Sequence, residues 1–375
     1  MAASPWGGSE ELWSQAALHL RKEGHQVSAC MVWSPNVAPK FLALKKEGIQ
    51  LRTQPRYLSL GVRAWKRLTS ILGRPPAEYA WIQHQNPDLA IISQGGNFDG
   101  LSWMEFCRDA QIPFMALVHC NTEEWWPPDG LATRMRAAYD AARKVACVSR
   151  HNLELLERQI GEPLPNTIVV WNPYEAPTNQ PPSWPAENGL WKMASVARLE
   201  PAAKGQELLF QIFSQSHWKE RPVELNLYGT GTSEETLRRL AGHLHLKNVH
   251  FRGYAKVKEI WGQNHLLVLA SRYEGLPLAL VEAMWFGRPA VVTDVGGNAE
   301  VCLDGQTGFV AAAPAVKLLE DTLERAWNHR KDWQRMGLAA RARAEELIPK
   351  DPVESFCSGL QELAETVGKA AIGKA

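Results

Sequence analysis

Residues 265–292 read HLLVLASRYEGLPLALVEAMWFGRPAVV, and the rest of the chain is best interpreted from them. Its apolar runs, residues 265–270 and 290–292, predict buried strands, and the residues between them predict a loop and then a helix that stops at Gly287. In such a β-α-β unit the strands are parallel and ligands bind at their carboxyl ends. Glu274, the flexible Gly275 and the first turn of a helix stand at that end. Because the first amides of a helix have no partner within it, the place suits a phosphate.

The two carboxylates of this stretch, Glu274 and Glu282, are eight residues apart. Glu154 and Glu162 have the same spacing, so the spacing alone identifies nothing. Only the first pair puts one carboxylate on a loop after a strand and the other on the helix that follows. Taken alone, the two residues are explained more simply as a surface Glu and a solvated helix Glu. The order of the whole string favours a site.

The string resembles the donor-binding core of the retaining glycosyltransferases of family 4, which have the GT-B fold. The resemblance rests on residues 274–284, EGLPLALVEAM, and on residues 287–300, GRPAVVTDVGGNAE. It implies an α/β protein with two Rossmann-like domains that face a central cleft. It also implies a C-terminal helix that crosses back to the N-terminal domain.

The length and the order of the predicted elements fit two domains. A chain of 375 residues is long for one domain. Strand-like and helix-like segments alternate on both sides of NPYEAPTNQPPSWPAEN, whose prolines indicate a linker. The alternation predicts parallel sheets covered on both faces. We expect an acceptor-side domain at 1–172, a linker at 173–189, a nucleotide-sugar donor-binding domain at 190–350 and the returning helix at 351–375.

The start of the chain departs from the family pattern. The family has a strand before a Gly-Gly loop, but here Gly7 and Gly8 follow only a few residues. We therefore expect the first strand to be missing or short, either because the sequence starts late or because the sheet lacks a strand. A helix is also predicted at 60–73. Its basic residues could contact anionic lipid, although a solvated basic face is the simpler explanation.

Composition narrows the class of protein. The net charge of +1 does not favour nucleic acid as a partner. The six cysteines form no CxxC pair and no signal peptide is apparent, which favours a cytoplasmic location with at most peripheral membrane contact. No apolar run is long enough to span a bilayer. The sequence leaves the oligomeric state open.

By the resemblance, the donor site lies in the C-terminal domain. An Arg and a Lys at the motif positions of Arg198 and Lys204 contact the donor phosphates in the family, and cations stabilise the charge that develops on a leaving diphosphate. The simpler explanation of this pair is a solvated loop. Glu274 is expected to contact the transferred sugar and Glu282 the ribose hydroxyls, since carboxylates accept hydrogen bonds from hydroxyls. The other expected donor contacts are Gly7, Gly8, Gly229, Gly231, Gly253, Tyr254, Gly275, Leu276, Pro277 and Leu278.

The acceptor side is less clearly marked. His119 ends a predicted strand, and in the family a His here lies near the reacting centre, although a structural role is equally consistent. Cys120 follows it where the family often has Asp. Trp125, Trp126 and Asn97 are candidates for the acceptor wall, and packing explains them nearly as well.

The sequence therefore predicts a retaining, metal-independent glycosyltransferase. It would transfer a hexose-like sugar from a UDP- or GDP-sugar, its co-substrate, to a hydroxyl of a saccharide or glycolipid, in polysaccharide or glycoconjugate synthesis. There is no DxD pair to hold a metal and no further cofactor is expected. One alternative is a GT-B nucleotide-sugar epimerase, for which the first domain offers only Asp99, Glu123 and Glu124. The other is a non-catalytic nucleotide-sugar-binding relic, which would explain the missing strand.

Overall fold

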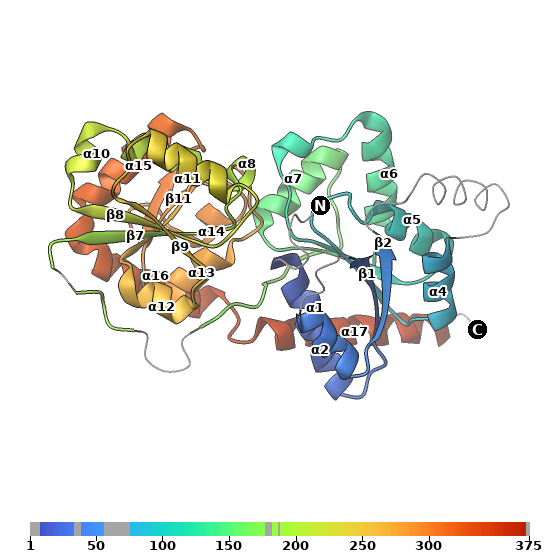
Figure 1. Ribbon diagram of the computed structural model, residues 1–375. Coiled ribbons are helices and arrows are strands. Elements are labelled where there is room, and N and C mark those ends of the chain that lie inside the picture. The colour runs from blue at the N-terminus through green and yellow to red at the C-terminus, as the bar shows by residue number, and fades with distance from the viewer. Residues whose placement is uncertain (1–7, 34–38, 56–75, 177–181, 187, 373–375) are drawn as a thin grey trace.

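The computed structural model describes residues 8–33, 39–55, 76–176, 182–186 and 188–372. The chain forms two lobes side by side, each built from parallel strands with helices packed around them (Figure 1). The prediction of two α/β halves is therefore confirmed. The predicted helix at 60–73 and Gly7 lie outside the described residues.

The N-terminal lobe contains two parallel sheets within the described residues, β1-β2 and β3-β4-β5-β6. Strand β3 has no partner on its outer side in this part of the chain, and its Ile91 is 37% exposed. No described strand precedes α1, and the prediction of a missing or short first strand stays a prediction because residues 1–7 are not described. The strands are β1 (Ser28–Trp33), β2 (Gln50–Pro55), β3 (Ala90–Gln94), β4 (Phe114–Val118), β5 (Lys144–Cys147) and β6 (Thr167–Val169). The helices are α1 (Gly8–Lys22), α2 (Pro39–Lys46), α4 (Ala77–Gln85), α5 (Leu101–Asp109), the 3-10 helix η1 (Glu123–Trp125), α6 (Asp129–Asp140) and α7 (Arg150–Ile160).

The C-terminal lobe has one six-stranded parallel sheet in the order β12-β11-β10-β7-β8-β9. Its strands are β7 (Trp191–Val196), β8 (Val223–Tyr228), β9 (Val249–Gly253), β10 (Leu266–Leu269), β11 (Ala290–Thr293) and β12 (Gly308–Ala311). Its helices are α8 (Pro201–Lys204), α9 (Gln206–Phe213), α10 (Ser216–Glu220), α11 (Glu234–His243), α12 (Val257–Gln263), α13 (Leu278–Trp285), α14 (Asn298–Val301), α15 (Val316–Asn328), η2 (Arg330–Asp332) and α16 (Trp333–Leu347). Every residue of β10 and β11 is buried, as expected for strands covered on both faces.

A single glycine joins two helices beside the end of β10. Gly205 has a φ of +60° and separates α8 from α9. A Cβ at this position would lie 2.1 Å from the carbonyl oxygen of Ala270, so only glycine fits between α9 and the end of β10. The break brings the C-terminal end of α8, with Lys204, against the loop that follows β10.

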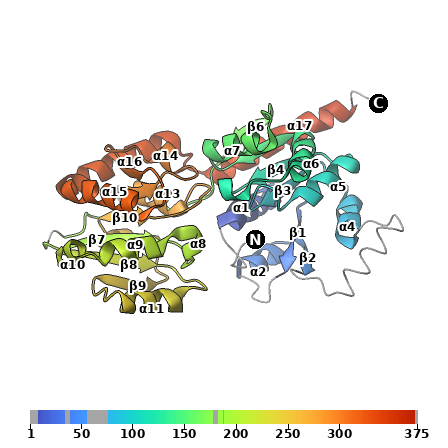
Figure 2. The same ribbon diagram turned by 90° about the horizontal axis from the view of Figure 1, so that it is seen from above.

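The last helix, α17 (Pro352–Ile372), runs along the N-terminal lobe in both views (Figures 1 and 2). Its Phe356, Cys357 and Leu360 are buried with Leu12 and Ala16 of α1. Burial of such apolar side chains stabilises the contact by about 1.5–3 kcal/mol for each large one. The predicted crossing of the C-terminal helix back to the N-terminal lobe is confirmed.

Candidate active site

The site lies where the chain changes direction across the C-terminal sheet. From β7 the chain continues to β8 and β9 on one side, and from β10 it continues to β11 and β12 on the other. Neighbouring strands β7 and β10 thus form a switch point, and ligands of open α/β sheets bind beside the carboxyl ends of such strands. Arg198 follows β7 and Glu274 follows β10. The sheet order therefore explains why residues far apart in the sequence come together.

Lys204 and Glu274 are in direct contact. The Lys204 Nζ donates to Glu274 Oε1 at 2.6 Å, and the Ser271 Oγ donates to the same oxygen at 2.7 Å. Only 16% of the Lys204 side chain and 9% of the Glu274 side chain are exposed. Two opposite charges held this close in a partly dry site fix each other's position. Lys204, predicted to bind phosphate, and Glu274, predicted to bind the sugar, are therefore adjacent in the structure.

Arg198 lies at the same mouth but is more open to solvent. Its Nη1 is 3.0 Å from the Glu200 Oε2, and its carbonyl oxygen accepts a hydrogen bond from Gln206 Nε2 at 2.7 Å. Burial raises the pKa of the nearby Cys120 thiol to about 12; the field of Glu274 adds to this shift, and those of Lys204 and Arg198 oppose it. The charges of all three residues thus act on a thiol of the other lobe.

His119 of the N-terminal lobe lies next to the Glu274 loop. It is buried at the end of β4, and its Nε2 is 3.1 Å from the Ser93 Oγ. Burial lowers the pKa of His119 to about 4, with the Asn172 side chain opposing the shift, so the imidazole is neutral near pH 7. Its carbonyl oxygen packs on Gly275, where a Cβ would be only 1.9 Å away. The predicted His and the Glu274 loop are therefore neighbours across the two lobes.

Glu282 stands apart from the Lys204–Glu274 pair. It lies on α13, and its Oε1 accepts from the backbone N–H of Glu175 at 3.4 Å. Burial raises the pKa of Glu282 to about 8, and the charge of Glu175 adds to this, although the hydrogen bond opposes it. The two predicted carboxylates thus have different partners in the structure.

The predicted glycines have several roles in the structure. A Cβ on Gly229 would lie 2.2 Å from the Ala197 carbonyl oxygen, and a Cβ on Gly231 would lie 2.4 Å from the Leu199 carbonyl oxygen. Both glycines therefore allow close packing on the segment that carries Arg198. Gly253 adopts a φ of +68°, and the next residue, Tyr254, is 87% exposed.

The remaining predicted donor contacts lie in the Glu274 loop, at the start of α13 and at the start of α1. Leu276 packs against buried side chains of both lobes, Pro277 is the N-cap residue of α13 and Leu278 is its first residue. Gly8 opens α1, and a Cβ there would contact nothing within 4 Å, so close packing does not require this glycine.

The predicted acceptor wall is only partly exposed. Trp125 reaches across the lobes to Tyr273, with ring centroids 5.3 Å apart, and Trp126 is 58% exposed. Asn97 is fully buried and its Nδ2 donates to Gln159 Oε1 at 2.7 Å, so it supports a loop and does not line the surface. Tyr273 was missed by the sequence reasoning, although it directly precedes Glu274.

Glu300 also has a role that its position in the sequence did not reveal. It lies within α14, and its carboxylate accepts hydrogen bonds from the backbone N–H groups of Arg150 and His151 at the start of α7. These two residues belong to the other lobe. The contact depends on how the lobes are placed, which no local pattern encodes.

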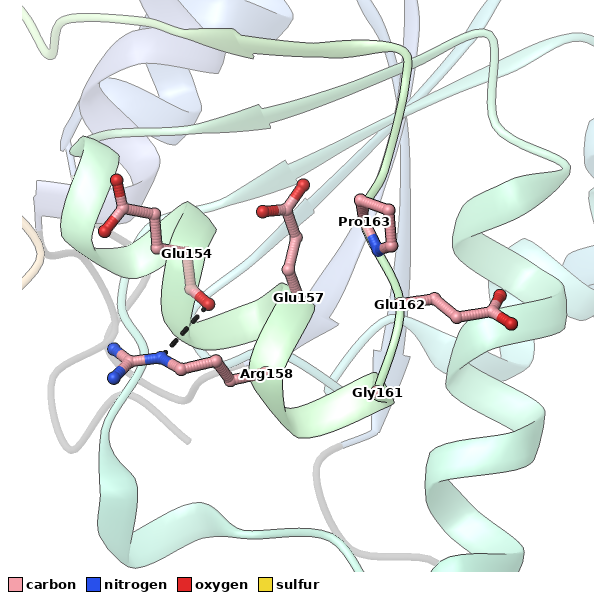
Figure 3. A pocket seen from close by; sticks show the side chains of 6 residues that line it. All are labelled: Glu154, Glu157, Arg158, Gly161, Glu162 and Pro163. Carbon is pink, nitrogen blue, oxygen red and sulfur yellow. Dashed lines mark hydrogen bonds between the residues drawn. The ribbon is translucent and has the colours of Figure 1, made fainter.

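An open groove of about 540 Å³ lies elsewhere, at the C-terminal end of α7 (Figure 3). It is lined by Glu154, Glu157, Arg158, Gly161, Glu162 and Pro163. The Arg158 Nε donates to the Glu154 carbonyl oxygen, and Glu157 accepts from the backbone N–H of Leu164. None of the predicted site residues borders this groove, and its polar groups serve the local fold.

The described ranges contain no group of three or more His, Cys, Asp or Glu side chains placed to hold a metal ion. No helix in this part of the chain combines the length and apolar character required to cross a bilayer.

Comparison with known proteins identifies the family. Residues 6–175 match the family model described as Glycosyltransferase Family 4, and residues 178–343 match the one described as Glycosyl transferases group 1. Among curated proteins, the GtfA subunit of UDP-N-acetylglucosamine–peptide N-acetylglucosaminyltransferase from Streptococcus pneumoniae is 31% identical over 29% of this chain and 22% of its own length. Alpha-D-kanosaminyltransferase of Streptomyces kanamyceticus is 28% identical over 33% of each chain. This chain thus spans between a fifth and a third of the length of these two relatives.

The fold is shared over nearly the whole chain. The Anabaena protein HepE, solved in complex with UDP, superposes with a TM-score of 0.75 over 98% of each chain at 18% identity. A separate structure of HepE contains UDP-glucose. At this identity the likeness concerns the fold, and it confirms the predicted GT-B architecture. Since the two family models together cover almost all of the sequence, in the order that two GT-B domains require, this chain belongs to the glycosyltransferases of family 4.

Proposed function

We propose that this chain is a retaining, metal-independent glycosyltransferase that transfers a sugar from a UDP-sugar to an acceptor hydroxyl. The observation that carries the proposal is the Lys204–Glu274 contact at the switch point, with Arg198 beside it. A cation pair next to a carboxylate suits a sugar linked to a diphosphate. HepE binds UDP and UDP-glucose on the same fold, which favours uridine over guanosine as the nucleoside.

Each group has a separate part in the proposed reaction. Arg198 and Lys204 stabilise the diphosphate as the bond between the sugar carbon and the phosphate oxygen breaks. Glu274 accepts hydrogen bonds from hydroxyls of the transferred sugar, and Glu282 from those of the ribose. His119, neutral at pH 7, lies beside the Glu274 loop near the reacting carbon. The acceptor oxygen bonds to that carbon on the face the phosphate leaves, and its proton passes to the departing phosphate oxygen, so no enzyme nucleophile is required.

The remaining assignments complete the proposal. The backbones of the loop residues 275–278 contact the donor, and so do those of the other predicted glycines, which are Gly7, Gly8, Gly229, Gly231 and Gly253. The loop after β9, with Tyr254, contacts the base. The acceptor is a saccharide or glycolipid bound by the N-terminal lobe. Domain boundaries at 172, 189 and 350, a cytoplasmic location and at most peripheral membrane contact belong to the same proposal.

The first test compares nucleotides and then variants. Thermal stabilisation by UDP, GDP and ADP identifies the base, and release of UDP from UDP-glucose, with and without candidate saccharides, measures turnover. Arg198→Ala and Lys204→Ala should each lower turnover by ~10²–10³-fold. Lys317→Ala is a control, because that Lys forms only an exposed i,i+4 pair with Asp321.

The choice of variants keeps the test clear. Removing one partner of a buried ion pair costs about 3–5 kcal/mol, so Lys204→Ala requires a check of its melting temperature. The half-exposed Arg198 does not carry that cost. Unchanged turnover in both variants would refute the proposed roles. Binding of UDP-glucose without any transfer or hydrolysis would favour the sugar-nucleotide-binding relic.

A further inference from the structure

One of the polar contacts between the two lobes centres on the Glu300 carboxylate. The Glu300 Oε1 accepts from the backbone N–H of His151 at 2.7 Å, and its Oε2 accepts from that of Arg150 at 3.1 Å. The Ser149 Oγ accepts from the backbone N–H of Asn152 at 3.2 Å. Three of the N–H groups left free at the start of α7 are thereby satisfied, and one carboxylate of the opposite lobe satisfies two of them. The positive end of the helix dipole adds to the attraction.

Glu300 is held firmly on its own side. The Arg343 Nη2 donates to the Glu300 carbonyl oxygen at 2.7 Å, and the Arg343 Nε donates to that of Val301 at 2.9 Å. Just before α14, the backbone N–H of Gly297 donates to the Gly275 carbonyl oxygen at 2.7 Å. Helix α14 is therefore tied both to α16 and to the loop that carries Glu274.

Helix α7 extends the connection into the acceptor-side loops. Near its start, the Asn152 Nδ2 donates to the Glu274 carbonyl oxygen at 3.3 Å. Near its end, the buried Gln159 Oε1 accepts from Asn97 at 2.7 Å and from Asn121 at 2.8 Å. These two residues belong to the loops after β3 and β4, and the second loop begins at His119. Figures 1 and 2 both show α7 on the side of the N-terminal lobe that faces the C-terminal lobe.

We propose that Glu300 and α7 form an interdomain strut that sets the distance between the Glu274 loop and the acceptor-side loops. Glu300 is then a positioning residue, which acts on the reaction through α7 and touches no substrate. The effect on turnover rests on the proposed function, whereas the strut itself does not. Because the donor contacts come mainly from the C-terminal lobe, loss of the strut lowers turnover and leaves donor affinity intact.

The experiment uses the full chain with Glu300→Ala, Glu300→Gln and a control, Glu235→Ala, whose side chain is 84% exposed. Hydrogen exchange at the amides of Arg150 and His151 is measured without any ligand. Calorimetry gives the affinity for UDP-glucose, and UDP release from saturating UDP-glucose gives turnover.

We expect faster exchange at both amides in Glu300→Ala, a fall in turnover of roughly 10–100-fold and a UDP-glucose affinity within about threefold of that of the native protein. Glu300→Gln should be intermediate, because an amide keeps one acceptor oxygen but turns an NH₂ toward a backbone donor. The control should behave as the native protein does.

Two results would overturn the strut. One is unchanged exchange of the two amides in Glu300→Ala. The other is unchanged turnover, or an affinity loss as large as the turnover loss, which would place Glu300 at the donor. If the native protein releases no UDP from any UDP-sugar, the proposed function fails, and the exchange measurement alone decides whether the strut exists.

Discussion

Substitution of Gly275 by Ala gives a sharp test of the closed arrangement of the lobes. A Cβ at this position would lie 1.9 Å from the carbonyl oxygen of His119 and 2.7 Å from the Val148 Cγ2. Ordinary contact begins at 3.4 Å, so the two segments must separate by about 1.5 Å. A displacement of about 1 Å at a reacting centre costs roughly 10²-fold in rate, and we expect at least that loss in turnover.

The assay separates this effect from unfolding. UDP release from UDP-glucose measures turnover, while the melting temperature should change little because the clash lies between lobes and leaves each core intact. Gly242→Ala is the matched control: it lies in α11 with nothing within 4 Å of a Cβ, and alanine should stabilise the helix by about 0.5–1 kcal/mol. If Gly275→Ala retained more than a third of native turnover, the close approach of His119 would not matter for the reaction.

Three further predictions concern titration and backbone geometry. Since burial raises the pKa of Glu282 to about 8, UDP-glucose affinity should increase as pH rises from 6 to 8.5, and calorimetry on Glu282→Gln should show no such increase. Burial lowers the pKa of His119 from 6.5 to about 4, so its contribution to stability is complete above pH 6.5 and is lost as the pH falls toward 4. Urea unfolding should therefore show that the free energy of unfolding falls by up to about 3 kcal/mol over this pH range, and this fall should be absent in His119→Gln. Gly205→Ala should destabilise the protein by at least about 2 kcal/mol in urea, because it combines a positive φ with a clash against Ala270; a native unfolding midpoint would contradict this.

Much of the C-terminal lobe could be predicted because its signals are local. Apolar runs at 265–270 and 290–292 marked β10 and β11, and Gly287 marked the end of the helix between them. The packing requirement for glycine at position 205 could not be predicted in this way. It depends on the Ala270 carbonyl oxygen, which is distant in the sequence and close only after β10 has entered the sheet.

The contacts between lobes were the least predictable part of the site. Glu300 and Tyr273 both lie next to residues that the sequence did single out. Their partners, the start of α7 and Trp125, belong to the other lobe. Sequence patterns describe each lobe separately, because each has its own core, and they carry no information on the relative placement of the two.

Two of the pairs of Glu residues with a spacing of eight show how much the surrounding elements matter. Glu154 and Glu162 flank an open groove at the end of α7, where Glu162 pairs with the exposed Arg136. Glu274, in contrast, follows a fully buried strand at the switch point, and Lys204 and Ser271 hold it. Glu282 lies on α13, the helix that follows the Glu274 loop, where burial raises its pKa to about 8. With the same spacing, Glu154 and Glu162 are thus solvated surface residues, whereas Glu274 and Glu282 lie in two different environments. The strand, loop and helix around the residues create this difference, since ligands of open α/β sheets bind beside the carboxyl ends of the strands and Glu274 follows such an end.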